Sequence, residues 1–176
     1  MKEKVKKLFD SLASQRDRWK RKNKYYYKEL EKLYSSFIPE NSSVLEIGCG
    51  TGELLAKIKA KRKLGIDLSP RMIEIAQKKY PQIDFIVGDA ENLQINEKFD
   101  YIVMSDLLGH LEDVWKAFRE LEKVSHSSTF LIINYFNYIW APILKLGEKI
   151  GLKMPEEIGN WFTWKDVNNL LYLNNF

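Results

Sequence analysis

The sequence predicts an α/β fold, a three-layer sandwich with a mainly parallel sheet. Three observations carry this prediction: short apolar runs alternate with amphipathic segments, the chain has 176 residues, and 45% of them are hydrophobic. Alternating strand and helix patterns are typical of βαβ units in a parallel sheet. A chain of this length buries roughly two thirds of its unfolded surface as one domain. We therefore expect one compact fold.

Five segments have the pattern of buried strands, and the segments between them have helical spacing. The expected strands are 43–47, 63–67, 83–87, 101–105 and 129–134. The expected helices are 52–60, 70–79, 113–124, 139–150 and 164–173. Ser69 with Pro70 is a typical start for the second helix, and Thr163 with Asp166 resembles a capping box for the last.

The N-terminal 38 residues differ in charge from the rest. They carry 12 Lys/Arg and 5 Asp/Glu, a net +7, whereas residues 39–176 have a net charge of −3. Apolar positions at helical spacing over 5–37 predict one or two amphipathic helices. We interpret 1–38 as a basic helical lid on a domain formed by 39–176. The alternatives for the basic segment 16–24 and the tyrosines after it are an anionic lipid or phosphorylated substrate, and nucleic acid.

Composition excludes several other classes of protein. The longest uncharged stretch, 127–144, is interrupted by Asn134, Asn137 and Pro142, so we expect no transmembrane segment. The N-terminus lacks the apolar run of a secretion signal, and we expect a cytoplasmic protein. Cys49 is the only cysteine, which excludes an internal disulfide, and it has no partners at metal-site spacing. We expect no metal.

A glycine-rich loop follows the first expected strand. Gly48, Gly50 and Gly52 alternate between this strand and a helix. Glycine lets a backbone turn and approach a ligand closely at the carboxyl edge of a sheet. Asp67 stands 19 residues after Gly48, at the end of the next strand. A carboxylate there can accept both hydroxyl hydrogens of a ribose.

The glycine spacing discriminates between two nucleoside cofactors. Dinucleotide-binding loops read G-x-G-x-x-G and place a pyrophosphate at the helix N-terminus. Here the third glycine comes one position early, and Glu46 and Glu53 put negative charge where the pyrophosphate would lie. A ligand with an ammonium and a sulfonium fits better, and a nicotinamide oxidoreductase remains an alternative.

The stretch from residue 44 to about 137 resembles the class I methyltransferases, which have a Rossmann-like sheet, use S-adenosyl-L-methionine and release S-adenosyl-L-homocysteine. It matches their E-x-G-x-G-x-G loop, their ribose-binding acid and their G-D-A-E-x-L stretch after the third strand. The resemblance implies that the methionine part of the cofactor is surrounded by Glu46, Gly48, Cys49, Gly50 and Gly52. It implies ribose and adenine contacts from Asp67, Leu68, Met72, Asp89, Ala90 and Glu91.

The fourth strand ends at Ser105, and segment 105–111 is similar to the family segment beside the transferred methyl group. Within it His110 is the nearest candidate for a general base, because an imidazole titrates near neutral pH. The alternatives are that His110 packs under the cofactor or caps the next helix. Alignment of the reactants alone can also be sufficient, without a base.

The acceptor is less defined. The fourth-strand end lacks the Asn/Asp-Pro-Pro-Tyr/Phe tetrapeptide of many amine methylases, so oxygen or carbon is favoured over nitrogen. Aromatic residues after the fifth strand favour an apolar or ring-containing acceptor, either a small molecule or a lipid-like one. The alternatives are a non-catalytic S-adenosylmethionine-binding module in a complex, and an RNA methyltransferase that uses the basic arm.

The resemblance also raises an expectation about the C-terminus. Class I methyltransferases usually close their sheet with two more strands, and this sequence ends where the sixth would begin. We expect this strand pair to be missing, which leaves the fifth strand at an unpaired edge. A truncated chain, a homo-oligomer or a partner that covers this edge would each account for it.

Overall fold

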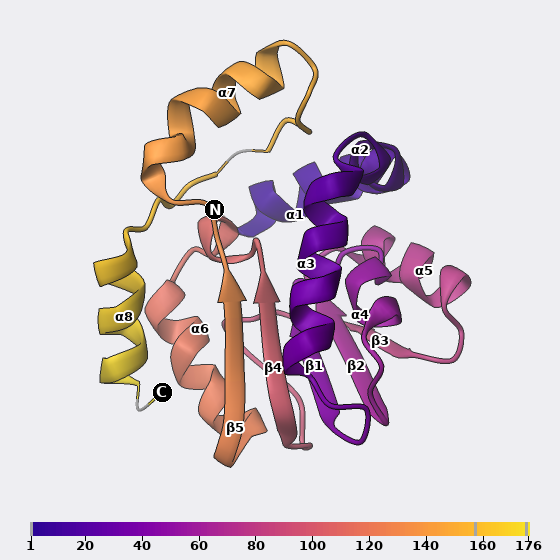
Figure 1. Cartoon of the computed structure of the whole chain (residues 1–176), viewed down its shortest axis with the longest axis vertical. Coiled ribbons are helices and arrows are strands. Elements are labelled where there is room, and N and C mark those ends of the chain that lie inside the picture. Colours follow the sequence, from indigo (N-terminus) through magenta and orange to yellow (C-terminus); the bar gives the residue numbers. More distant parts are fainter. Residues whose placement is uncertain (1, 157, 175) are drawn as a thin grey trace.

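The protein is built around one five-stranded parallel sheet in a computed structural model that describes residues 2–156, 158–174 and 176. The strands lie in the order β3-β2-β1-β4-β5, and every neighbouring pair is parallel. They are β1 (Ser43–Ile47), β2 (Arg62–Asp67), β3 (Asp84–Val87), β4 (Phe99–Ser105) and β5 (Ser125–Asn134). Their carboxyl ends meet at the upper edge of the sheet in Figure 1. The predicted α/β class is confirmed.

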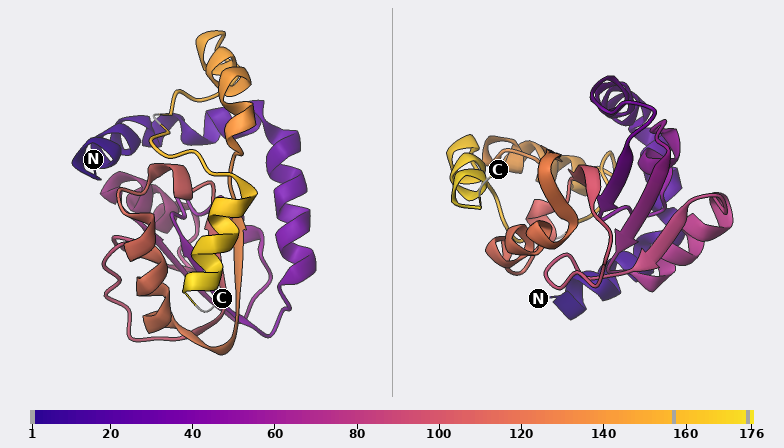
Figure 2. Two further views of the ribbon diagram at one scale, coloured as in Figure 1. Left: turned by 90° about the vertical axis from the view of Figure 1, so that its left-hand side faces the viewer. Right: turned by 90° about the horizontal axis from the view of Figure 1, so that it is seen from below.

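Helices cover both faces of the sheet and complete the three layers. The helices on one face are α3 (Lys24–Phe37), α4 (Glu53–Lys57) and α5 (Pro70–Lys79), and those on the other are α6 (Val114–Leu121) and α8 (Trp164–Leu173). Tyr34 and Leu55 share one apolar cluster with Val44, whereas Phe118 shares a second with Leu45. Because consecutive residues of a strand point to opposite faces, β1 supplies both clusters. Figure 2 shows the sheet between the two helical layers.

Two helices have the bounds that the sequence predicts. The Ser69 side chain accepts a hydrogen bond from the Met72 N–H at the start of α5, and Thr163 with Asp166 forms both bonds of a capping box at the start of α8. Both helices therefore begin at local capping signals. In contrast, α4 ends at Lys57, earlier than predicted, because Ile58 is extended and buried in the core.

The other boundaries differ by a few residues. β5 begins at Ser125, four residues before the predicted start, and Ser125 pairs with Phe99 across a register shift. The predicted helix 139–150 is a 3-10 turn, Tyr138–Trp140, that continues into α7 (Ala141–Lys149). The first residues of β5 are polar, so a search for apolar runs does not include them in the strand. The strand is nevertheless held by backbone pairing to β4.

The N-terminal arm forms three helices, where the sequence predicts one or two. They are α1 (Lys2–Leu12), α2 (Arg16–Lys22) and α3, and a 3-10 turn, Ala13–Gln15, joins the first two. α3 lies along the sheet, while α1 and α2 cross above the carboxyl ends of the strands (Figure 1). Asp10 accepts a hydrogen bond from the Ser69 hydroxyl, and Lys79 Nζ lies 2.8 Å from Asp17. These contacts fasten the arm to α5.

The chain after β5 leaves the sheet and returns. α7 stands apart from the layers in Figure 1, and none of its residues is buried. Residues 150–156 and 158–163 lie between α7 and α8, and α8 lies beside α6. β5 is an edge strand of the described sheet, as expected. In the part of the chain that the structure describes, no helix combines the length and apolar character needed to cross a membrane.

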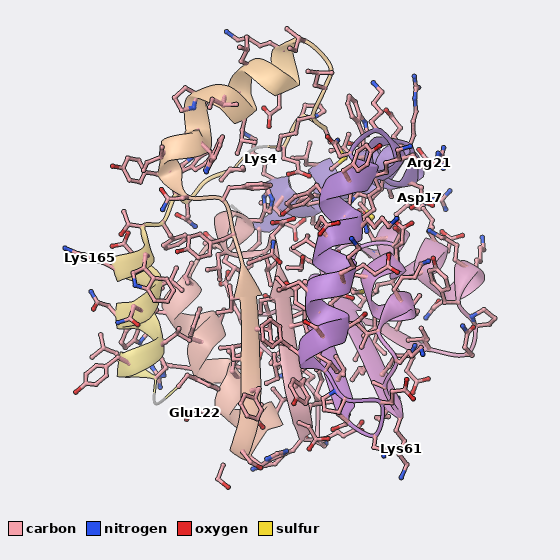
Figure 3. All side chains as sticks on the ribbon, viewed as in Figure 1. Lys4, Asp17, Arg21, Lys61, Glu122 and Lys165 are labelled. Carbon is pink, nitrogen blue, oxygen red and sulfur yellow. The ribbon has the colours of Figure 1, made fainter. Side chains whose placement is uncertain are left out.

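Charged side chains mark the outside of the molecule. In Figure 3, Lys61 and Glu122 lie at the end of the sheet opposite α1 and α2, and Lys165 lies on α8. Arg21 and Asp17 lie on α2, at the same end as the carboxyl ends of the strands.

Candidate active site

A cavity of about 330 Å³ lies between the carboxyl ends of the strands and the N-terminal arm. Its floor is formed by the ends of β1, β2 and β4 and by the turn after β3. Residues of α1, α2 and α3 and residues 153–156 form its roof. The arm residues that line it are Lys2, Val5, Phe9, Arg16, Trp19, Asn23, Tyr26 and Tyr27. This volume is typical of a small-molecule site.

The glycine loop forms the centre of the floor. Gly48, Gly50 and Gly52 all have positive φ, at 78°, 54° and 75°, which L-residues with side chains rarely adopt. The Gly48 N–H donates to the Ile66 carbonyl at 2.8 Å, so the loop bends back over β2. A Cβ on Gly52 would lie 2.5 Å from the Phe85 ring. Gly52 thus packs inside the fold, whereas Gly48 and Gly50 line the cavity.

Asp67 joins β2 to this loop. One carboxylate oxygen accepts the Gly50 N–H at 2.8 Å, and the other accepts the Ser69 N–H at 2.9 Å. Each oxygen keeps a further lone pair for a ligand hydroxyl. Burial raises the pKa of Asp67, against the effect of these two backbone bonds. The carboxylate is therefore rigidly held in the position from which it can accept two hydroxyl hydrogens.

The predicted adenine side has a mixed composition. Leu68, Met72 and Ala90 line the cavity with Asp89 and Glu91. Asp89 accepts the Glu91 N–H at 2.9 Å, and Lys2 Nζ lies 2.7 Å from Asp89 and 2.8 Å from Glu91. Lys2 therefore covers both acids from the arm.

Glu91 also has a structural role that the sequence does not reveal. Its Oε1 accepts the backbone N–H groups of Glu112 at 2.8 Å and Asp113 at 3.1 Å. These bonds hold the turn that leads into α6. Since one of its carboxylate oxygens is used in this way, Glu91 has less capacity for a ligand than the resemblance implies.

Glu46 and Cys49, which the resemblance places around the methionine part of the cofactor, do not line the main cavity. They line a second cavity of about 470 Å³, which shares Arg16, Gly48 and Asp106 with the first. Burial raises the pKa of Glu46 to about 8, although Lys20 opposes this shift. Burial likewise raises the pKa of the Cys49 thiol. Cys49 is consequently a buried thiol without nucleophilic character.

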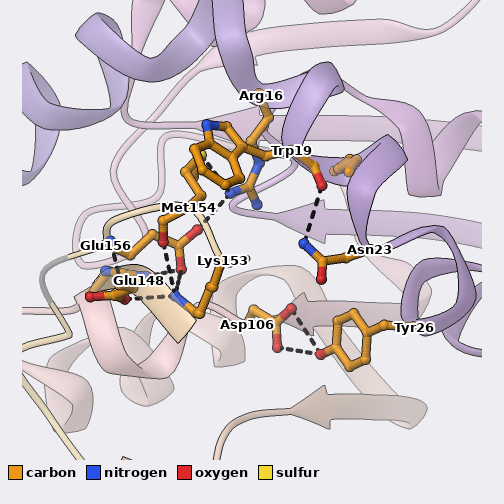
Figure 4. Close-up of polar contacts among 12 residues, drawn as sticks. Arg16, Trp19, Asn23, Tyr26, Asp106, Glu148, Lys153, Met154 and Glu156 are labelled. Carbon is orange, nitrogen blue, oxygen red and sulfur yellow. Dashed lines mark hydrogen bonds and ion pairs between the residues drawn. The ribbon is translucent and has the colours of Figure 1, made fainter. Parts of the chain in front are cut away.

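A buried charge cluster closes the roof (Figure 4). Arg16 Nη1 lies 2.8 Å from Glu156 Oε1, and Lys153 Nζ lies 3.1 Å from Glu156 Oε2 and 3.0 Å from Glu148. Burial opposes ionisation, but Arg16 and Lys153 lower the pKa of Glu156. The cluster joins α2 to the segment after α7, 140 residues away in the sequence.

Two donors in the roof have no hydrogen-bond partner among the described residues. They are Arg16 Nε and Trp19 Nε1, and both are buried. Arg16 Nε would lie 3.9 Å from a Cβ placed on Gly50, so it faces the glycine loop across the cavity. Unpaired buried donors cost free energy, which a ligand with acceptor atoms can recover.

Asp106 is the residue of this site that sequence reasoning did not single out. Among the described residues other than glycine it alone has a positive φ, 53°. Its carboxylate accepts hydrogen bonds from the Tyr26 hydroxyl at 2.9 Å and from Asn134 Nδ2 at 2.6 Å. Burial raises the pKa of Asp106 to about 6, while the Tyr26 bond lowers it. Strained backbone at a buried carboxylate is typical of functional sites.

Comparison with known proteins identifies the family of the central part of the chain. The profile of a family described as "Methyltransferase domain" matches residues 44–127. The chain is 35% identical over 85 residues to a demethylmenaquinone methyltransferase of Chlorobaculum tepidum. The aligned segment covers 46% of this chain and 35% of that relative. It is 30% identical over 139 residues to a malonyl-[acyl-carrier protein] O-methyltransferase of Priestia megaterium. That alignment covers 75% of this chain and 51% of the relative. Residues 44–127 are therefore a methyltransferase domain of the class I type.

A solved structure agrees with this assignment at the level of the fold. An S-adenosylmethionine-dependent methyltransferase of Thermotoga maritima, described as a possible histamine N-methyltransferase, superposes with a TM-score of 0.79 over 98% of this chain and 81% of its own. The two are 22% identical. The matched segment covers about a third to a half of the length of the two curated relatives above.

Most of the predicted site residues lie together. Those that line the main cavity are Gly48, Gly50, Asp67, Leu68, Met72, Asp89, Ala90, Glu91, Ser105 and His110. His110 belongs to a 3-10 turn, Leu108–His110, after β4. Its Nε2 lies 4.0 Å from Glu156, and its ring meets Phe9 edge to face at 5.0 Å. His110 is therefore part of the boundary between floor and roof.

Proposed function

We propose that this chain transfers a methyl group from S-adenosylmethionine to a small-molecule or lipid-like acceptor, at oxygen or carbon. The observation that carries the proposal is the anchoring of Asp67 to the Gly50 N–H at the floor of a covered cavity. This bond ties the expected ribose acid to the expected methionine loop. The name of one relative, the malonyl-[acyl-carrier protein] O-methyltransferase, supports an oxygen acceptor.

The residues present fit the cofactor. Gly50 leaves room for close approach, Asp67 keeps lone pairs for the ribose, and Arg16 Nε is a buried donor that can bind the methionine carboxylate. Leu68 and Met72 supply apolar surface for the adenine. When bound, S-adenosylmethionine supplies an electrophilic methyl group on a sulfonium and leaves as S-adenosylhomocysteine.

Asp106 is the general base that we propose for the acceptor. It lines the cavity beside Ser105, at the end of the strand next to the glycine loop. With a pKa of about 6 it is ionised at neutral pH and basic enough to take a proton from an acceptor hydroxyl or carbon acid. Tyr26 and Asn134 hold the carboxylate in place by donating hydrogen bonds to it. His110 remains a second candidate, because it also lines the cavity.

The lid interpretation of the arm is supported by its aromatic residues. Trp19 and Tyr26 line the cavity, and the Tyr26 ring stacks on Phe136 at a centroid distance of 6.0 Å. Together they offer flat apolar walls near Asp106, which suit a ring-containing acceptor. Since these two aromatics are directed to the cavity, the nucleic-acid alternative for the arm loses Trp19 and Tyr26 as stacking residues.

Methyl transfer is tested with S-adenosylmethionine labelled in its methyl group. We expect label to pass to phenols, quinols or hydroxylated lipids, and we expect no labelled RNA. Cofactor binding without product from any of these acceptors would favour the non-catalytic module instead. Labelled RNA, with binding that falls steeply as salt rises, would favour the RNA methyltransferase.

A further inference from the structure

The outer side of α7 is apolar although it faces solvent. Ile139, Ile143, Leu146 and Ile150 are 66%, 58%, 58% and 61% exposed. They are spaced by four, three and four residues, so they lie along one side of the helix and its flanking turns. Soluble surfaces rarely carry a continuous apolar stripe of this kind without a binding partner. We call these four residues, with Trp140 and Leu152, the α7 face.

The opposite side of α7 fixes its orientation. Leu144 lines the main cavity, and Glu148 accepts a hydrogen bond from Lys153 Nζ at 3.0 Å. These contacts hold that side toward the domain. The α7 face therefore points away from the protein, as the isolated position of the helix in Figure 1 also indicates. Rotation of the helix to bury the apolar side would break the Glu148 ion pair.

Positive charge lies beside this face. Ranges 16–24 and 138–154 are both fully described, and every exposed charged residue in them is basic: Arg18, Arg21, Lys22, Lys24, Lys145 and Lys149. The two ranges are in contact, because Lys22 Nζ donates to the Gly151 carbonyl at 3.1 Å and Asn23 Nδ2 donates to the Leu152 carbonyl at 3.2 Å. One end of the molecule thus combines apolar side chains with cations.

We propose that the α7 face binds the surface of an anionic lipid bilayer. Apolar side chains of a surface helix insert at the level of the headgroups, while flanking lysines and arginines bind the lipid phosphates. A second copy of the chain fits less well, since it would bring two basic rims together. Because Leu144 lines the cavity from the same helix, docking would place the cavity near the lipid. Lipid binding itself does not require the proposed methyl transfer.

Sedimentation with vesicles tests the proposal. We expect the chain to bind vesicles of phosphatidylcholine and phosphatidylglycerol, and to bind pure phosphatidylcholine vesicles much more weakly. Ile143→Asn with Leu146→Asn should lower the partition coefficient by about tenfold or more, because two inserted side chains become polar. The matched control is Leu33→Asn with Leu173→Asn, which removes two exposed leucines from α3 and α8 and should leave binding unchanged.

Charge variants, added salt and controls for folding and cofactor binding complete the test. Lys145→Gln with Lys149→Gln should weaken binding to anionic vesicles, and added salt should do the same. Far-UV circular dichroism and binding of S-adenosylhomocysteine should be unchanged in all three double variants, which separates this proposal from the proposed function. Absence of vesicle binding, equal loss in the Leu33/Leu173 control, or a dimer that only the Ile143/Leu146 variant dissociates would overturn the proposal.

Discussion

The floor and the roof of the cavity are built in different ways. The floor, formed by the glycine loop, Asp67 and the end of β4, is held by backbone hydrogen bonds between neighbouring strands. The roof is formed by α1, α2, α3 and residues 153–156, and charged side chains such as Arg16 and Glu156 join α2 to the last of these segments. Backbone pairing is insensitive to most substitutions, whereas a roof of ion pairs depends on individual residues. We therefore expect the floor, apart from its glycines and Asp67, to tolerate substitution better than the roof.

The largest effect is expected from Gly50→Val in the floor. A β-branched residue at a φ of 54° costs about 1–2 kcal/mol or more, and its side chain would project toward Arg16 across the cavity. We expect loss of detectable S-adenosylhomocysteine binding in a chain that still folds. Gly52→Val, which would clash with the Phe85 ring, should destabilise the fold more. Equal binding by Gly50→Val and the wild type would refute the position of the loop.

Asp106→Asn tests the proposed general base, which lies where the floor and the roof of the cavity meet. Loss of a general base lowers the rate by about 10²- to 10⁴-fold, while cofactor affinity should stay the same. In the wild type, kcat should fall as the pH drops through about 6, because protonated Asp106 cannot accept a proton. His110→Gln serves as the comparison. A larger loss in His110→Gln than in Asp106→Asn would transfer the role of base to His110.

Asp67→Ala should change cofactor affinity alone. Loss of hydrogen bonds to a charged group weakens binding by about 1.5–3 kcal/mol. Calorimetry with S-adenosylhomocysteine measures this directly, and the KM for the acceptor should be unaffected. Unchanged cofactor affinity would mean that the ribose lies elsewhere.

The smallest effect is expected from Tyr26→Phe in the roof. The Tyr26 hydroxyl stabilises ionised Asp106, so its removal should raise the pKa of Asp106 and shift the pH profile of kcat upward. The loss of one such bond is worth about 1 kcal/mol, roughly fivefold in rate. Tyr25→Phe, at a ring that is 77% exposed, is the matched control. An unshifted pH profile of kcat would mean that Tyr26 does not affect the pKa of Asp106.

The difference between floor and roof also explains which features of the molecule can be predicted from the sequence. The five strands, the glycine loop and Asp67 depend on local signals: apolar runs, alternating glycines and a capping serine before Pro70. These signals are present within a few residues of the structure that they determine. The same holds for α8, whose capping box is complete within four residues.

The remaining features depend on contacts between distant residues. Arg16 and Glu156 are 140 residues apart, and neither has a local pattern that indicates the other. Asp106 becomes distinctive only through its positive φ and its bonds to Tyr26 and Asn134. Glu91 matches the family motif, yet the backbone groups that it binds belong to a turn 21 residues later. Sequence reasoning therefore locates the glycine loop and Asp67 more fully than the roof of the cavity.

Calorimetric titration of the purified chain with S-adenosylmethionine, S-adenosylhomocysteine and NADH tests the central claim most directly. We predict micromolar binding of the first two, about 10-fold or more weaker binding to Asp67→Ala, and no heat from NADH. Binding of NADH in place of the two adenosyl compounds would contradict the assignment of the glycine loop, and with it the proposed methyl transfer.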